Sequence, residues 1–213
     1  MTALRRRRAP VPLLVVTVLA ALLVGLGLSV AAVAAVAEGV RRAATASSTA
    51  PAGPTSPSQT VTESMRLLTG RMDGHPGWPR YTNASWSVQA DDTVVLRITS
   101  YDDGAAPLGG MQAMMFDQVH GTVGGTETVD GKPVRAVANT DVAHTFTVVG
   151  LGLNLPIPAA PTGGSVTVVA RFVVHRAGSY LWQCYAPCGS GVNSMGGAMS
   201  TERWMEGTVK VVA

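Results

Sequence analysis

The feature of this sequence that most restricts its fold is a two-residue alternation of apolar and polar side chains, which recurs from about residue 64 onward. Val94, Leu96 and Ile98, for example, alternate with residues that include Arg97 and Thr99. Such alternation is typical of a half-buried β-strand. Similar runs, separated by Gly, Pro and Asp clusters, occur at 142–148, 166–174, 180–184 and 209–211. Because no long stretch has helical periodicity, we predict an all-β fold, either a sandwich or a small barrel.

One short segment fits neither class clearly. Residues 111–116 (MQAMMF) are compatible with a short helix or with a strand. The sequence leaves this choice open.

The N-terminal 42 residues have a different character from the rest of the chain. Residues 13–37 are uncharged and mostly apolar, and they follow four arginines at 5–8. As a helix this run could cross a hydrocarbon core of about 30 Å. The arginines favour a cytoplasmic N-terminus, so we predict that residues 1–42 form a single-pass anchor in the cell membrane, with the folded part on the extracytoplasmic side. The alternative is a cleaved signal peptide, since Ala-Val-Ala triplets near Ala37 resemble a cleavage site.

Residues 43–62 read as a linker between this anchor and the folded domain. They are rich in Ala, Ser, Thr and Pro and lack aromatic residues, so they cannot bury enough surface to offset the entropy of ordering. We therefore place the folded domain at 63–213. The chain has 16 Lys and Arg against 13 Asp and Glu. Six of the basic residues flank the apolar run, which leaves the folded part slightly acidic and argues against a nucleic-acid partner.

The candidate chemistry lies in three places. His144 is in phase with Val142, Phe146 and Val148, so its imidazole should point to the core. A histidine satisfied by a backbone carbonyl near the end of a sheet is the simplest explanation for His144 alone. The other two places are Cys184, at the end of a predicted strand, and the loop that follows it. Soft donors follow one another through this region: Cys184, Cys188, Met195, Met199 and Met205.

These donors allow two structural interpretations. Thiolate and thioether ligands beside an imidazole suit copper, especially cuprous copper. The chain has two cysteines, and in an oxidising compartment a Cys184–Cys188 disulfide is the alternative. A thiol–disulfide oxidoreductase is poorly supported, because no thioredoxin-like βαβ pattern surrounds the pair.

Several motifs resemble those of cupredoxins, and most closely the copper-carrying outer domain of cytochrome c oxidase subunit II. The resemblance implies a Greek-key β-sandwich and a copper cofactor, with His144 as the upstream histidine ligand, Cys184 and Cys188 as thiolates, and one methionine as a weak ligand. The motifs that carry it are D-V-A-H-T-F at 141–146, P-T-G-G at 161–164, A-G-S-Y-L-W-Q-C at 177–184, C-Y-A-P-C-G at 184–189 and M-E-G-T-V-K-V at 205–211.

The sequence also departs from that family pattern. The second histidine of the two-copper site is replaced by Val192, and the acidic residue between the cysteines by Ala186. His120 could replace the missing histidine from another loop. Counting back from the last strand favours Met205 as the thioether ligand, counting forward from Cys188 favours Met195, and Met199 is a third option. A single-copper site could be built from this set.

Together these features predict a membrane-tethered, extracytoplasmic copper-binding protein. We expect single-copper electron transfer or copper handling rather than enzymatic activity, in a protein that could be an accessory to a terminal oxidase. Its partner would be a redox protein or a copper donor or acceptor. The alternative is a metal-free structural or interaction module with a Cys184–Cys188 disulfide.

Overall fold

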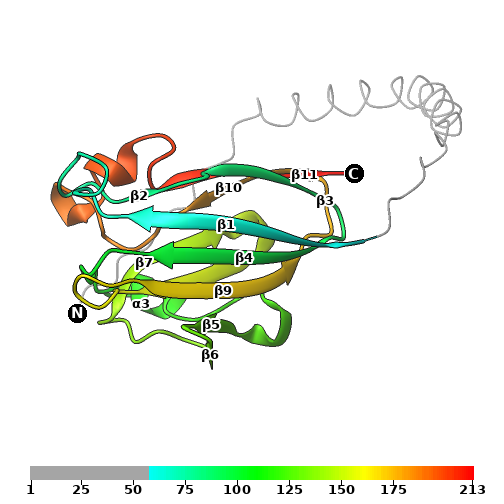
Figure 1. Cartoon of the computed structure of the whole chain (residues 1–213), viewed down its shortest axis with the longest axis horizontal. Helices are drawn as coiled ribbons and strands as arrows, with labels where there is room; N and C mark the ends of the chain where they lie inside the picture. The colour runs from blue at the N-terminus through cyan, green and yellow to red at the C-terminus, as the bar shows by residue number, and fades with distance from the viewer. Residues whose placement is uncertain (1–57) are drawn as a thin grey trace, which may run out of the picture. The chain divides into compact units, whose positions relative to one another are not determined.

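The computed structural model describes residues 58–213, and these form a β-sandwich of a six-stranded and a five-stranded sheet (Figure 1). The expectation of an all-β sandwich is therefore confirmed. The predicted anchor and most of the predicted linker lie outside the described residues. Strand β1 begins at Thr60, so residues 60–62 belong to the sheet and not to the linker. Among residues 58–213, no helix has the length and apolar character needed to cross a membrane.

The six-stranded sheet is mixed, with strand order β2-β1-β4-β9-β5-β6. β1 runs parallel to β4, and β4 runs antiparallel to β9, as the three long adjacent arrows in Figure 1 show. In β4 and β9 every second residue is buried, which is the alternation that the sequence predicts. The strands are β1 (Thr60–Leu68), β2 (Arg80–Tyr81), β4 (Thr93–Ser100), β5 (Glu127–Val129), β6 (Lys132–Val134) and β9 (Val166–Val173).

The five-stranded sheet carries the candidate site and has the order β3-β11-β10-β7-β8. β10 and β7 pair only at Gln183 and Thr147, so the sheet opens directly beside Cys184. Between Val142 and His144 the pairing of β7 with β8 shifts by one residue, a bulge that changes the direction of the side chains. The strands are β3 (Ser85–Gln89), β7 (Val142–Val148), β8 (Leu153–Pro158), β10 (Gly178–Gln183) and β11 (Glu206–Val212).

Helical turns within the described residues are short and lie in the connections. The undecided segment is a helix, α3 (Met111–Phe116), which lies between β4 and β5 in the chain. Two of the 3₁₀ turns belong to the loop that follows Cys188. The 3₁₀ turns are η1 (Val123–Gly125), η2 (Val149–Leu151), η3 (Val192–Ser194) and η4 (Gly197–Ser200).

Aromatic side chains pack in the core next to the strand end that carries the candidate site. Trp182 is fully buried, stacks on Phe146 with ring centroids 5.0 Å apart, and meets Tyr81 edge to face at 4.9 Å. Its indole N–H donates to the carbonyl of Ala84 at 2.8 Å. Rings with such contacts have few alternative positions. The end of β10, where Cys184 follows, therefore rests on a rigid base.

Candidate metal centre

Three donors from distant parts of the chain meet where β10 leaves the five-stranded sheet. His144 lies on β7, Cys184 directly follows β10, and Cys188 lies four residues further on. One ligand atom from each lies within 4.8 Å of the other two. The two Sγ atoms are 3.5 Å apart, and both cysteines are free thiols. The structure thus brings together the histidine and both cysteines that the sequence singles out.

The environment of Cys184 favours the thiolate, the form that binds metal ions. Its side chain is fully buried, and its Sγ accepts a hydrogen bond from the backbone N–H of Thr145 at 3.3 Å. Burial alone would raise the pKa of this thiol. The hydrogen bond from Cys188, together with the charge of the neighbouring His144 imidazole, nevertheless holds the pKa well below its ordinary value.

Cys188 is the complementary member of the pair. Its hydrogen bond to Cys184, followed by burial, raises the pKa of the Cys188 thiol well above its ordinary value. The opposite directions of the two pKa shifts favour Cys184 as the thiolate and Cys188 as the thiol that donates to it. A metal ion would displace the proton of Cys188, because the ligand form of cysteine is the thiolate.

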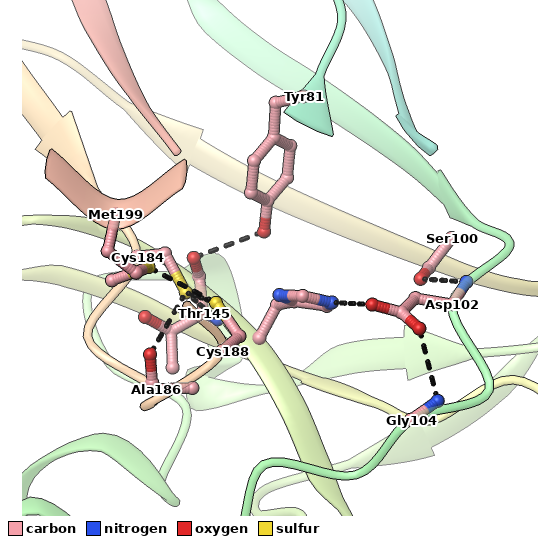
Figure 2. Close-up of polar contacts among 10 residues, drawn as sticks. Tyr81, Ser100, Asp102, Gly104, Thr145, Cys184, Ala186, Cys188 and Met199 are labelled. Atoms are coloured by element: carbon pink, nitrogen blue, oxygen red, sulfur yellow. Dashed lines mark hydrogen bonds and ion pairs between the residues drawn. The ribbon is translucent and has the colours of Figure 1, made fainter. Parts of the chain in front are cut away.

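His144 is held by a carboxylate that the sequence did not assign to the site. Its Nε2 lies 2.9 Å from Oδ2 of Asp102. Burial would lower the pKa of His144, but the hydrogen bond that its Nε2 donates to Asp102, followed by the neighbouring Cys184 sulfur, outweighs that effect and raises the pKa to about 9. Burial would raise the pKa of the Asp102 carboxyl, but its hydrogen bond with His144 outweighs this and lowers that pKa. In Figure 2, Asp102 lies across the site from Cys184, Cys188 and Thr145.

The other imidazole nitrogen is the clearest sign that the residues fit a metal ion. Nδ1 of His144 is buried, and no hydrogen-bond partner of standard geometry satisfies it. A buried polar atom without a partner costs free energy, and native structures rarely leave one. Because Asp102 accepts the proton of Nε2, Nδ1 is the nitrogen that could bind a metal ion, and the ion would displace the proton that the raised pKa keeps there. A carboxylate on the far nitrogen is the usual arrangement around histidine ligands.

The three candidate methionines occupy different environments. Met199 is buried, and its Sδ lies 3.2 Å from Sγ of Cys188, so the structure brings it to the thiol pair. Met205 is fully buried, and its backbone carbonyl accepts the N–H of Cys184 at 2.9 Å. Met195 is 36 % exposed. A Cβ on Gly189 would lie 2.7 Å from Cγ of Met199, so this glycine permits the close approach of Met199.

The remaining histidines lie outside this cluster. His120 is exposed, and its backbone pairs with Asn154. His75 and His175 are also exposed. Val192, at the position of the second histidine in the family resembled, is 88 % exposed. Within residues 58–213, the donor set therefore contains one imidazole.

Sequence analysis missed two residues of the site, Asp102 and Thr145. The side chain of Asp102 is only 20 % exposed and binds His144. Thr145 donates its N–H to Cys184, accepts the N–H of Tyr185 at Oγ1, and accepts the hydroxyl of Tyr81 at its carbonyl. No spacing pattern signals either residue, although Thr145 is adjacent to the predicted histidine ligand.

A cavity of about 910 Å³ reaches one side of the centre. Its lining includes Cys188 and Asp102, together with Arg71, Met72 and the glycine-containing turn at 162–164. Cys184 and His144 do not line it and are fully buried. The centre is therefore closed on the side of the core and approachable on the side of Cys188.

The chain was compared with known families and proteins. No family model matches the sequence, and no curated protein matches it. Solved structures of copper proteins are similar to the domain. Rusticyanin from Thiobacillus ferrooxidans is 17 % identical, with a TM-score of 0.33 over 75 % of this chain and 85 % of that chain. Auracyanin A, a "blue" copper protein from the green thermophilic photosynthetic bacterium Chloroflexus aurantiacus, is 13 % identical, with a TM-score of 0.33 over 71 % and 98 %.

The class of protein follows from its fold and from the residues of its site. This is an all-β sandwich domain in which two cysteines and one histidine converge where β10 and β7, two inner strands of the five-stranded sheet, separate. The three residues form a candidate copper site.

Removing the carboxylate behind His144 is expected to weaken metal binding without abolishing it. In Asp102→Ala the imidazole loses the partner that fixes its orientation, and changes of this kind typically reduce metal affinity about 10- to 100-fold. The measurement is competition against a cuprous chelator of known affinity. Asp103→Ala removes the neighbouring, exposed carboxylate and serves as the matched control. Equal affinities in the two variants would show that Asp102 does not support the ligand.

Proposed function

We propose that this domain binds one copper ion through Nδ1 of His144 and the Sγ atoms of Cys184 and Cys188, with Met199 as a weak fourth ligand. The observation that supports this most directly is the buried Nδ1 without a partner, on an imidazole that has a ring nitrogen within 4.8 Å of two thiol sulfurs. Two thiolates, one imidazole and a thioether form a soft donor set, which suits cuprous copper. When bound, the ion would supply a one-electron centre or serve as cargo.

Copper handling is the function that this geometry supports best. The cavity on the side of Cys188 gives an incoming ligand access to one of the two sulfurs, which exchange of the metal requires. Fully buried Cys184 and His144 would hold the ion until the exchange is complete. Single-copper electron transfer is the second candidate, because strands and packed aromatic rings fix the ligands and limit their rearrangement.

The proposal also includes the location of the domain and the kind of partner that it meets. We infer that the apolar segment 13–37 tethers the domain to the cell membrane, with the domain on the extracytoplasmic side. The motifs shared with the outer domain of oxidase subunit II support a role as an accessory to a terminal oxidase, with a copper donor or acceptor, or a redox protein, as partner. Alkaline extraction of membranes tests the tether, because an integral anchor stays in the pellet.

The deciding experiment is copper stoichiometry with a visible absorption spectrum, measured on the purified full chain after reduction of both cysteines. One tightly bound, colourless copper per chain would support cuprous copper and handling. An intense thiolate-to-copper band would support electron transfer instead. No uptake by the reduced protein would refute both, and a disulfide in the protein as isolated would then favour the structural module.

A further inference from the structure

The short helix α3 presents three methionine side chains to solvent. Met111, Met114 and Met115 are 77 %, 80 % and 55 % exposed. The helix, MQAMMF, contains no charged residue and buries none of its side chains. A surface helix ordinarily covers its solvent face with charged or polar groups. Core packing therefore does not explain these methionines, and they do not resemble an ordinary solvated surface.

The spacing of these residues puts Met111 beside Met114 and Met115 on the surface of the helix. Residues three and four apart in a helix are neighbours on one face, which applies to Met111 with both Met114 and Met115. Methionine side chains are flexible enough to converge on a common point. Thioether sulfur is a soft ligand that selects Cu(I) over the hard divalent ions. Three such sulfurs on one exposed face provide a cuprous ligand set without any charged residue.

The helix is also attached to the loop that carries the candidate centre. Nε2 of Gln112 donates to the carbonyl of Tyr185 at 3.0 Å, and the Phe116 ring stacks on the Tyr185 ring with centroids 4.5 Å apart. Tyr185 directly follows Cys184. Nδ2 of Asn154, on β8, donates to the carbonyl of Phe116 at 3.1 Å. The methionine face is thus fixed to the same loop as the thiolates.

We propose that Met111, Met114 and Met115 form a second, weaker Cu(I) site, which captures the ion at the surface and passes it to His144, Cys184 and Cys188. The capture of Cu(I) is inferred from the exposed methionines alone. The transfer of the ion to the centre rests on the proposed function of that centre. In the transfer, Cu–thioether bonds break and Cu–thiolate and Cu–imidazole bonds form. The protons displaced from Cys188 and from Nδ1 of His144 go to solvent, and copper remains Cu(I) throughout.

The capture step is tested in a protein that lacks the thiols. The full chain with Cys184→Ser and Cys188→Ser, labelled with ¹³C at the methionine methyl groups, is titrated with Cu(I) under anaerobic conditions. We expect the methyl signals of Met111, Met114 and Met115 to shift together as one equivalent is added. Met72, which is 50 % exposed on the loop between β1 and β2, is the internal control and should not follow them. Unchanged signals from the three α3 methionines would overturn the proposal.

A substitution by leucine separates copper capture from hydrophobic docking. Leucine keeps the volume and apolar character of methionine but lacks the sulfur. In the thiol-free chain, Met111→Leu, Met114→Leu and Met115→Leu together should abolish the shared Cu(I) equivalent. If the leucine variant binds Cu(I) as before, the thioethers are not the ligands and the proposal fails.

The transfer step is tested by loading kinetics with both cysteines present. The triple leucine variant should load the centre several-fold more slowly from a weak Cu(I) complex and reach the same final affinity. Loading at the wild-type rate would refute an entry role and favour a docking face for a protein partner. If the α3 methyl signals shift but the centre takes up no copper, the entry site stands and the proposed function of the centre fails.

Discussion

Replacing Cys184 by serine is expected to abolish tight copper binding by this protein. Cys184 supplies the sulfur with the lowered thiol pKa, and its Sγ is fully buried between the N–H of Thr145, the Cys188 thiol and His144. A serine hydroxyl does not ionise near neutral pH and is a hard donor, so it offers cuprous copper neither the charge nor the softness of a thiolate. The measurement is bound copper per chain after passage over a desalting column.

The same substitution should leave the fold intact, which separates loss of a ligand from loss of structure. Serine Oγ can accept the hydrogen bond that Thr145 now donates to Cys184, so no buried donor loses its partner. Met195→Leu, in the same loop, is the matched control, and it should retain one copper because Met195 is 36 % exposed. A folded Cys184→Ser protein that still binds copper tightly would contradict the assigned centre.

The strands and the donor residues were predictable because each follows from a local pattern. The alternation in β4 and β9 marks the buried face residue by residue. The phase of His144 with Phe146 and Val148 correctly predicts that its side chain is buried. β7 does not follow the expected alternation of buried and exposed residues, because Thr145 and Thr147 on its other face are buried as well. Thr145, for example, accepts the N–H of Tyr185, which lies 40 residues further along the chain, and apolar–polar alternation cannot predict such a contact.

The rest of the site depends on contacts that no local pattern records. Asp102 follows β4 and meets His144 across a separation of 42 residues, so only the fold reveals that its carboxylate is a partner. The choice among the methionines depends on the path of the loop, and the approach of Met199 to Cys188 requires space at Gly189. α3 was ambiguous because all of its residues except Gln112 are apolar, so the segment shows no polar–apolar periodicity. Its contacts with Tyr185 and Asn154 hold it in place.

A buried glutamate should make the stability of the domain fall as pH rises. Glu127, on β5, is 1 % exposed, and neither carboxyl oxygen has a hydrogen-bond partner among the described residues. Burial raises the pKa of this carboxyl from 4.5 to about 9. The folded protein therefore keeps a proton on Glu127 that the unfolded chain releases above pH 4.5. By linkage, Glu127 does not change the free energy of unfolding below pH 4.5. As pH rises from 4.5 to about 9, it lowers the free energy of unfolding progressively, and above about pH 9 its effect is constant.

Glu127→Gln should remove this pH dependence. At pH 7 the raised pKa corresponds to a penalty of about 3 kcal/mol, which is a large fraction of the stability of a typical domain. The variant should therefore gain stability relative to the wild type as pH rises from 5 to 9, because its amide does not titrate. The measurement is urea unfolding of both proteins across this range, taken as a difference so that all other titrating groups cancel. Glu202→Gln, which removes an exposed carboxyl, is the control. Parallel stability curves for Glu127→Gln and the wild type would show that Glu127 is already ionised in the folded protein.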